Sequence, residues 1–412
     1  MIKKLLIIIA VLATFLVVSC QKSETDNIKD NEKTEQPSNC IYYTTSDGKK
    51  LTPSQTETSC FGASLVSNTY ADGQGVLVFD NAVTSIGNEA FRSCSTLASI
   101  SIPSSVTLIG DKAFRFCSSL ASITIPNGVT TIGEEALSMC SILKTVEIPN
   151  SVTSIGDQAF RNCPKLRNIT IPNGITSIGN RTFFHCPKLK SITIPDSITS
   201  IGEMAFYGCL SLESVTIPQS VTSIGDGAFA ACPSLTEFKG KFASDNGRCL
   251  IVDGVFHAFA STELTEYTIP DNVTSIGYCA FYGFSNLKSI IVPDSVTSIE
   301  NEAFRECLNL TDINIPNGVT SIGEAAFFGC SSLPSITIPQ SVVSIRERAF
   351  LGCSDLMSVY CLPTTPPAGA KDMFVSGSTL LKIYVDTKCL GIYRRAPFWR
   401  NYDSYLTDHD FS

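Results

Sequence analysis

The residues whose number and spacing most suggest chemistry are the cysteines, of which the 412-residue chain has 17. Ten of them fall on one regular grid, most of them 23 residues apart, at Cys94, Cys117, Cys140, Cys163, Cys186, Cys209, Cys232, Cys307, Cys330 and Cys353. A disulfide requires Cβ atoms about 4 Å apart that face each other, whereas equivalent side chains of stacked repeats run parallel. We therefore predict ten buried free thiols. Disulfides are the second alternative, and metal is the third because no paired Cys/His motif is present.

Four further cysteines lie off this grid, near the ends of the regular pattern. Cys40 and Cys60 flank the N-terminal end, and Cys361 and Cys389 flank the C-terminal end. Either pair could form a disulfide bridge, because exported proteins fold in oxidising surroundings.

Histidine and acidic residues show no arrangement typical of catalysis. The three histidines, His185, His257 and His409, are far apart in the sequence, and each is interpreted as a surface or hydrogen-bonded residue. The sequence contains no HExxH, GxSxG, phosphate-loop or paired CxxC motif. Acidic residues such as Glu134 and Asp157 follow a recurring glycine, where a negative charge favours the start of a helix. The sequence therefore predicts no catalytic residue, no metal ligand, no cofactor and no enzyme.

The elements that position the cysteines belong to a repeat, exemplified by residues 148–170, IPNSVTSIGDQAFRNCPKLRNIT. Its proline recurs every 23 residues apart from one wider gap, at Pro103, Pro126, Pro149, Pro172, Pro195, Pro218, Pro270, Pro293, Pro316 and Pro339. A fixed period of this length indicates a solenoid, in which each repeat buries its apolar face against its neighbours. We predict a β-rich solenoid of about eleven α/β repeats of 23 residues.

Each repeat is expected to contain two short strands and one helical turn. In the segment from Leu166 to Ile171, alternation places Leu and Ile toward the core and the intervening residues outward. A second strand covers 152–156 and ends at Gly156, where a positive φ or a close backbone approach is expected. Ala159, Phe160 and Cys163 have the spacing of one helical turn that directs Phe into the core.

The regular pattern has distinct flanks and one interruption. Residues 40–82 form a predicted β cap with turns at Asp47-Gly48 and Asp72-Gly73, because the first repeat needs a covered face. Repeats occupy 83–238 and 269–361, and residues 239–268 form an inserted hairpin with a turn at Asp253-Gly254. After Cys361 the grid stops, and 362–412 form a C-terminal cap whose last strand is 383–385. One elongated domain is expected.

The N-terminus is typical of an exported chain. Residues 1–19 combine a short basic start with an apolar run, which indicates a signal peptide. The order Val17, Val18, Ser19, Cys20 resembles a bacterial lipobox, so Cys20 is the predicted lipidation site and 20–39 a disordered polar tether. A plain secretory signal is the alternative. The formal net charge is −8 and no run of basic residues occurs, so nucleic acid is not an expected partner.

The pattern IPxxVTSIGxxAFxxCxxL, over 41–403, resembles the BspA-like leucine-rich-repeat surface proteins of anaerobic and host-associated bacteria. The resemblance implies a right-handed, curved leucine-rich-repeat stack on the cell surface. It also implies adhesion to host matrix proteins, host receptors or other bacteria. Together with Cys20 it implies a lipid anchor in the outer membrane of a Bacteroidetes-type organism. Glu300 and Arg346, which replace the recurring glycine, depart from the pattern only locally.

Two surfaces are candidates for binding. The first is the outward strand row, which lines the usual ligand face in leucine-rich repeats and consists here of Ser99, Ser101, Ser122, Thr124, Thr145, Glu147, Asn168, Thr170, Ser191, Thr193, Ser214 and Thr216. Because these residues are small and polar, a solvated β surface without a ligand is an equal alternative. The second is the inserted hairpin, in which Phe256, His257 and Phe259 are the candidate specificity residues.

The sequence thus predicts a lipid-anchored binding or adhesion module at the cell surface. Its expected partners are host extracellular matrix or receptor proteins, or glycans, and the membrane through its N-terminal anchor. A structural or self-assembling surface-layer component is the alternative, and a carbohydrate-active enzyme is the third.

Overall fold

The computed structural model of the chain describes residues 36–244, 246–260, 263–374 and 381–411. The predicted signal peptide, the lipidation site Cys20 and the tether up to residue 35 lie outside the described residues. Among the described residues, no helix is both long enough and apolar enough to cross a membrane.

Short strands dominate the described chain. Those before residue 200 are β1 (Cys40–Thr45), β2 (Leu65–Ala71), β3 (Gln74–Phe79), β4 (Ser85–Ile86), β5 (Leu97–Ser101), β6 (Leu108–Ile109), β7 (Ser122–Thr124), β8 (Thr131–Ile132), β9 (Thr145–Glu147), β10 (Ser154–Ile155), β11 (Asn168–Ile169) and β12 (Ser177–Ile178). They are followed by β13 (Ser200–Ile201), β14 (Ser214–Ile217), β15 (Ser223–Ile224), β16 (Glu237–Gly240), β17 (Cys249–Val252), β18 (Val255–Phe259), β19 (Glu266–Thr268), β20 (Ser275–Ile276) and β21 (Ser289–Ile291). The remaining strands are β22 (Ser298–Ile299), β23 (Asp312–Ile313), β24 (Ser321–Ile322), β25 (Ser335–Ile338), β26 (Ser344–Ile345), β27 (Ser358–Cys361), β28 (Lys382–Asp386) and β29 (Leu406–His409). The helices are α2 (Thr58–Phe61), α3 (Leu390–Tyr393) and the 3-10 helix η1 (Trp399–Tyr405).

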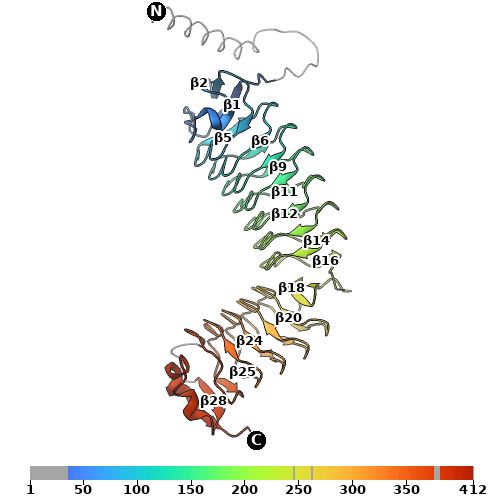
Figure 1. The fold of residues 1–412 in the computed structure, drawn as a ribbon, viewed down its shortest axis with the longest axis vertical. Helices are drawn as coiled ribbons and strands as arrows, with labels where there is room; N and C mark the ends of the chain where they lie inside the picture. The colour runs from blue at the N-terminus through green and yellow to red at the C-terminus, as the bar shows by residue number, and fades with distance from the viewer. Residues whose placement is uncertain (1–35, 245, 261–262, 375–380, 412) are drawn as a thin grey trace, which may run out of the picture. The chain divides into compact units, whose positions relative to one another are not determined.

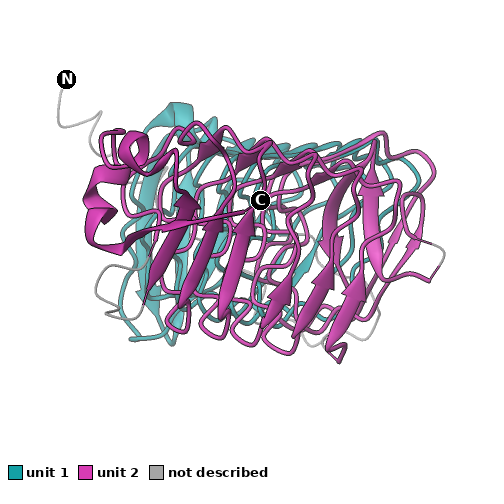
Figure 2. Cartoon of the chain, turned by 90° about the horizontal axis from the view of Figure 1, so that it is seen from below, with its two compact units in different colours: residues 1–200 teal, residues 201–412 magenta. Residues whose placement is uncertain are grey.

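The chain divides into two compact units, residues 1–200 (unit 1) and 201–412 (unit 2) (Figure 2). Each unit is a β-solenoid whose repeats lie side by side, with about 14 turns in the two together (Figure 1). In unit 1 the strand order is β11-β9-β7 in one sheet and β10-β8-β6-β4 in another. Their register joins residues 23 apart, as in Ser122 with Thr145. This confirms the leucine-rich-repeat stack.

Apolar columns fill the interior of both units. Phe91 and Phe114 stack with ring centroids 5.5 Å apart, and Phe327 and Phe350 stack at 5.1 Å. All four rings are fully buried, and the Val, Ile and Leu residues at the other inward positions of these repeats are also buried. The 23-residue period therefore places like side chains on like side chains, and each repeat buries its neighbour's apolar face.

The N-terminal cap is an antiparallel sheet, as predicted. Strand β1 pairs with β3 on one side and with β5 of the first repeat on the other. The Asp72-Gly73 turn joins β2 to β3, but Asp47-Gly48 is a turn without a hairpin partner. The cap thus covers the edge of the first repeat.

The predicted helical turn after each recurring glycine is wrong. Glu89 and Ser93, on either side of the buried Phe91, have positive φ angles of 57° and 59°. Their backbone N–H groups donate to the carbonyls of Asp111 and Arg115 in the next repeat, at 2.8 and 2.7 Å. Every second N–H group of this segment donates to the neighbouring repeat, whereas those of Ala90 and Arg92 donate to the carbonyl three residues earlier in their own repeat. The segment therefore extends the ladder between repeats and is not an α-helix.

At Gly156 the recurring glycine lies at a close backbone approach between repeats. Gly156 does not have a positive φ, but a Cβ built there would lie 2.5 Å from the backbone nitrogen of Glu134 and 2.7 Å from the carbonyl carbon of Gly133. Both atoms belong to the preceding repeat, so this position sets how closely consecutive repeats approach.

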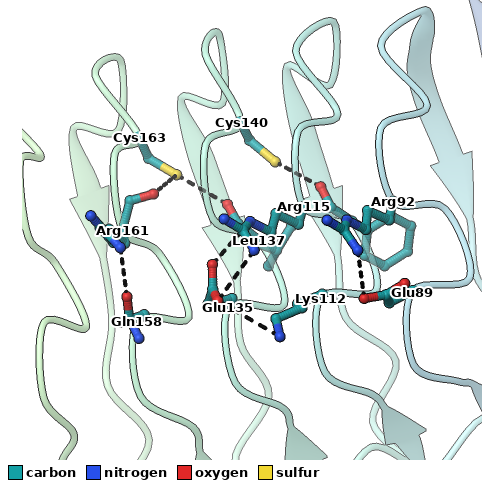
Figure 3. Close-up of polar contacts among 11 residues, drawn as sticks. Glu89, Arg92, Lys112, Arg115, Glu135, Leu137, Cys140, Gln158, Arg161 and Cys163 are labelled. Carbon is teal, nitrogen blue, oxygen red and sulfur yellow. Dashed lines mark hydrogen bonds and ion pairs between the residues drawn. The ribbon is translucent and has the colours of Figure 1, made fainter.

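The grid cysteines are buried free thiols, which confirms the prediction. Most of these thiols donate to a carbonyl 26 residues earlier, as in Cys140 to Phe114 at 3.3 Å and Cys163 to Leu137 at 3.2 Å (Figure 3). Burial raises the pKa of the Cys163 thiol to about 12. The thiols therefore stay neutral and serve packing and hydrogen bonding.

Neither of the two disulfides that the sequence left open, Cys40 with Cys60 and Cys361 with Cys389, forms. Cys60 is a buried free thiol, so it does not form a disulfide with Cys40. Cys361 and Cys389 are also buried free thiols, and the Cys361 Sγ lies 3.4 Å from the Tyr393 hydroxyl instead. The two cysteines of each pair lie near the same cap in the sequence, but the fold does not bring their Cβ atoms face to face, as a disulfide requires.

The inserted segment stacks on the repeats. Strands β17 and β18 form a hairpin around Asp253-Gly254, as predicted. Strand β18 also pairs in parallel with β20, with Phe256 opposite Ile276, so the hairpin extends the sheet of the following repeats.

The repeat also continues beyond Cys361, where the sequence indicated that it stops. Phe374 stacks on Phe350 at 5.4 Å, and β28 pairs in parallel with β27. Strand β29, which sequence reasoning missed, then pairs with β28. Trp399 is fully buried and its Nε1 donates to the Pro367 carbonyl at 2.7 Å, which closes this end.

The close approach at Gly156 yields a stability prediction. Gly156→Ala should lower the free energy of unfolding by about 1–3 kcal/mol, because the new methyl group overlaps the backbone of the preceding repeat. Gly391→Ala is the matched control, since its nearest neighbour is the flexible end of Arg395 at 3.8 Å. Urea unfolding of both variants measures the difference, and equal stabilities would contradict the packing argument.

The buried thiols yield a pH prediction. Above pH 9 the unfolded chain loses thiol protons that the folded chain retains until about pH 12, so folding stability should fall as pH rises through this window. Cys163→Ala should reduce that slope by up to about 1.4 kcal/mol per pH unit. Urea unfolding between pH 8 and 11 measures the slope. Ser118→Ala, which leaves every thiol in place, should keep the wild-type slope, and an unchanged slope in Cys163→Ala would disprove the assignment.

Candidate binding surfaces

The predicted outward strand row is exposed in the structure. Its members project from β5, β7, β9, β11 and β14 and from the equivalent segment 191–193, and the inward residues between them are buried. All twelve residues, from Ser99 to Thr216, are exposed. Apart from Glu147 they carry only hydroxyl or amide groups. The row can therefore form many weak hydrogen bonds, but it has no large apolar side chain to anchor a protein partner.

The candidate specificity residues of the inserted hairpin are not on the surface. Phe256, His257 and Phe259 are 0%, 8% and 2% exposed. The Phe256 ring stacks on Phe281 at 4.8 Å, so it takes a place in the apolar column of the following repeats. Burial lowers the pKa of His257, which favours the neutral imidazole. These side chains therefore pack in the core.

Unit 2 carries aromatic residues on the outward row at its C-terminal end. Tyr360 of β27 and Tyr384 of β28 are paired, with ring centroids 5.0 Å apart and an interplanar angle of 12°. The His409 ring of β29 lies 5.5 Å from Tyr384. Sequence reasoning did not single out Tyr384, although the alternation of β28 gives the signal for it.

Unit 1 contains a groove of about 1010 Å³ that crosses five consecutive repeats. Each repeat contributes two lining residues, one from the left-handed turn after the buried Phe and one two positions later. We call this the turn groove, and it is lined by Ser93, Ser95, Phe116, Ser118, Met139, Ser141, Asn162, Pro164, His185 and Pro187. Its surface combines an exposed aromatic ring, a methionine and two prolines with hydroxyl and amide groups, as in sites that bind extended peptide or small-molecule groups.

The turn groove rests on a column of strained residues. Ser93, Phe116, Met139, Asn162 and His185 all have φ between 52° and 63°. Unit 2 places glycine at most equivalent positions, at Gly208, Gly283, Gly329 and Gly352. A left-handed backbone costs an L-residue about 1–2 kcal/mol, and least for Asn, Asp and His. Side chains that persist at such a cost are typical of functional surfaces.

Ion pairs and hydrogen bonds hold the wall of the turn groove. The Arg115 guanidinium pairs with Glu135 at 2.9 Å, and its Cζ lies 4.9 Å from the Phe116 ring centroid. Arg161 donates to Gln158 at 2.8 Å in a later repeat (Figure 3). Arg115 thus links a carboxylate beneath the surface to an aromatic ring on it, which fixes the orientation of that ring.

The titratable residue of the turn groove is His185. Burial, and then the positive charge of Arg161, lower its pKa, so the imidazole is neutral at physiological pH. Within the described residues there is no group of three or more His, Cys, Asp or Glu side chains placed to hold a metal ion. The groove therefore offers apolar and hydrogen-bonding contacts.

The position of Phe116 predicts an unusual response to mutation. Phe116→Gly should change the free energy of unfolding by less than about 1 kcal/mol, because relief of the backbone strain offsets the smaller packing energy of a ring that is 38% exposed. The neighbouring Phe114→Gly should cost about 3–5 kcal/mol, because that ring is fully buried in the stack. Urea unfolding compares the two, and similar losses would show that Phe116 belongs to the core.

Comparison with known proteins places this architecture in a family. The chain matches the BspA type leucine rich repeat region over residues 74–186, 153–244 and 256–366. No curated protein matches. Among solved structures it is similar to a leucine rich cell surface protein from Faecalibacterium prausnitzii, with 33% identity, a TM-score of 0.63 and coverage of 76% of this chain and 86% of that one.

Two further structures extend the comparison. A leucine-rich repeat protein from Bacteroides ovatus is 26% identical, with a TM-score of 0.48 and coverage of 88% of this chain and 99% of that one. The pneumococcal vaccine antigen PcpA shares the fold at 19% identity, with a TM-score of 0.57 and coverage of 83% and 86%. The match of the family profile to more than half of the sequence decides the assignment: the chain belongs to the BspA-type leucine-rich-repeat family.

Proposed function

We propose that this protein is a cell-surface binding or adhesion module that presents its repeats to host matrix proteins, host receptors or other bacteria. Membership of a leucine-rich-repeat family with cell-surface relatives supports a surface role based on protein interaction. The observation that carries the proposal is the turn groove, where five consecutive repeats hold non-glycine residues in a left-handed backbone. Its aromatic and apolar side chains supply the anchors that the outward strand row lacks.

Anchoring through Cys20 completes the proposal. A lipid on this cysteine, followed by the polar segment 21–39, would display the solenoid outside the outer membrane. Many copies per cell would then make a weak contact effective, because linked sites raise the local concentration.

The ends of the stack favour binding over self-assembly. Strand β1 covers the first repeat as an antiparallel partner of β5, and Trp399 and Tyr393 are fully buried beside the last strands. Covered ends disfavour the head-to-tail addition of further copies.

The proposal predicts groove-dependent binding to host protein. The purified chain should bind at least one of immobilised collagen, laminin or fibrinogen, and Phe116→Gly with Met139→Gly should weaken that binding about tenfold or more, as loss of an anchor does. The matched control is Phe398→Gly, which removes another exposed phenylalanine, at a φ of 63°, from unit 2. Surface plasmon resonance measures the affinities.

Two outcomes would contradict the proposal. The first is equal binding by the groove variant and the control. The second is an absence of binding combined with concentration-dependent growth of particle size in light scattering, which would establish the self-assembling alternative.

A further inference from the structure

The repeat brings together basic residues that are far apart in the sequence. Lys144, Arg167 and Lys190 occupy one position in three consecutive repeats of unit 1. The backbone N–H of Arg167 donates to the Lys144 carbonyl at 3.2 Å, and that of Lys190 donates to the Arg167 carbonyl at 3.3 Å. All three residues are exposed. They therefore form a basic column with about 5 Å between neighbours.

A second basic column runs beside the first. Lys165 and Lys188 precede Arg167 and Lys190 by two residues, with the buried Leu166 and Leu189 between them. Both lysines are exposed and directly follow Pro164 and Pro187, which line the turn groove. Three adjacent repeats thus present five basic side chains, which we call the basic patch.

The charges of the basic patch are largely available. Among the described residues, Lys144, Lys165, Arg167 and Lys188 take part in none of the ion pairs. Many carboxylates of unit 1, such as Glu89, lie instead in the turn after the recurring glycine. In a chain of net charge −8, the five basic side chains outnumber the adjoining carboxylate of Glu147 and give the patch a positive potential of its own.

The fold does not require this arrangement. Like charges opposite each other on neighbouring strands destabilise a sheet by a few tenths of a kcal/mol or more. The two preceding repeats have alanine in the column of Lys144, at Ala98 and Ala121, and they stack in the same register. A polyanionic partner would offset the repulsion, and so the basic patch is explained as a binding site for one.

The surroundings of the patch select the kind of polyanion. The adjoining outward row carries Thr145, Asn168 and Ser191, whose hydroxyl and amide groups can hydrogen-bond to sugar hydroxyls. This row has no aromatic side chain on which unpaired nucleobases could stack. It also has no large apolar residue to anchor an acidic protein.

We propose that unit 1 binds an anionic polysaccharide, carboxylated or sulfated, across the repeats that contain Lys144, Arg167 and Lys190. This inference rests on the proposed surface role only because such a polysaccharide occurs outside the cell. The polysaccharide contact is made by different side chains from those of the protein-binding turn groove.

Binding of the purified chain to two probes, heparin and polygalacturonate, tests the inference by isothermal calorimetry or fluorescence anisotropy. At least one should bind, and its affinity should fall steeply between 50 and 200 mM salt, because bound counterions are released. Replacing Lys144, Lys165, Arg167 and Lys188 by Gln should weaken binding at least tenfold. The matched control makes the same charge change at the exposed residues Lys49, Lys50, Lys288 and Lys388 and should retain wild-type affinity. Neutral dextran should not bind.

Several results would overturn the inference. One is the failure of both probes to bind to the wild type, and another is an equal loss of affinity in both Gln variants, which would indicate a non-specific charge effect. Tighter binding of duplex DNA or polyglutamate at the same patch would reject a polysaccharide in favour of those polymers. The collagen, laminin and fibrinogen assay is run on the same variants. In the basic-patch variant, loss of heparin binding with intact protein binding supports the inference and leaves the proposed function unaffected. Loss of protein binding with intact heparin binding would overturn the inference but not the proposed function.

Discussion

The structure depends on one constraint, the in-register hydrogen bonding of each repeat to the next. The N–H groups of Thr107, Thr130 and Thr153 each donate at 2.9 Å to the carbonyl 23 residues earlier. A change of one residue in the period would turn inward side chains outward, because strand side chains alternate. The backbone therefore fixes the repeat length, and the repeat length fixes which residues meet. Gly156 belongs to the same constraint, since a Cβ there would overlap the backbone of the preceding repeat.

This constraint turns every position of the repeat into a column. Inward columns give stacked rings such as Phe91 on Phe114, and thiols that bond to carbonyls and not to each other. Outward columns repeat one side chain at intervals of about 5 Å, so a substitution shared by a few neighbouring repeats creates an extended surface. Both the turn groove and the basic patch arise in this way within unit 1. Binding surfaces can therefore differ along the stack while the core stays the same.

The sequence was sufficient to predict what depends on period and alternation. It predicted the stacked repeats, the buried Cys163 and the exposure of Ser122 and Thr124. It failed where hydrogen-bond partners lie in another repeat: the spacing of Ala159, Phe160 and Cys163 indicated a helix, but the Phe160 N–H donates to the Thr182 carbonyl of the next repeat. The degenerate repeat that contains Phe374 was not recognised from the sequence, because it lacks the recurring sequence pattern. Lys144 and Arg167 form no run in the sequence, because the register brings them together.

Native-state hydrogen exchange tests the central claim most directly, because it reads the ladder between repeats amide by amide. The account predicts strong and similar protection for the amides of Thr107, Thr130 and Thr153, whose only backbone acceptors lie in the preceding repeat among the described residues. It predicts the same for Thr297 and Thr320 in unit 2. Exchange of these amides at the rate of an unstructured peptide, in a protein that is otherwise folded, would contradict the account.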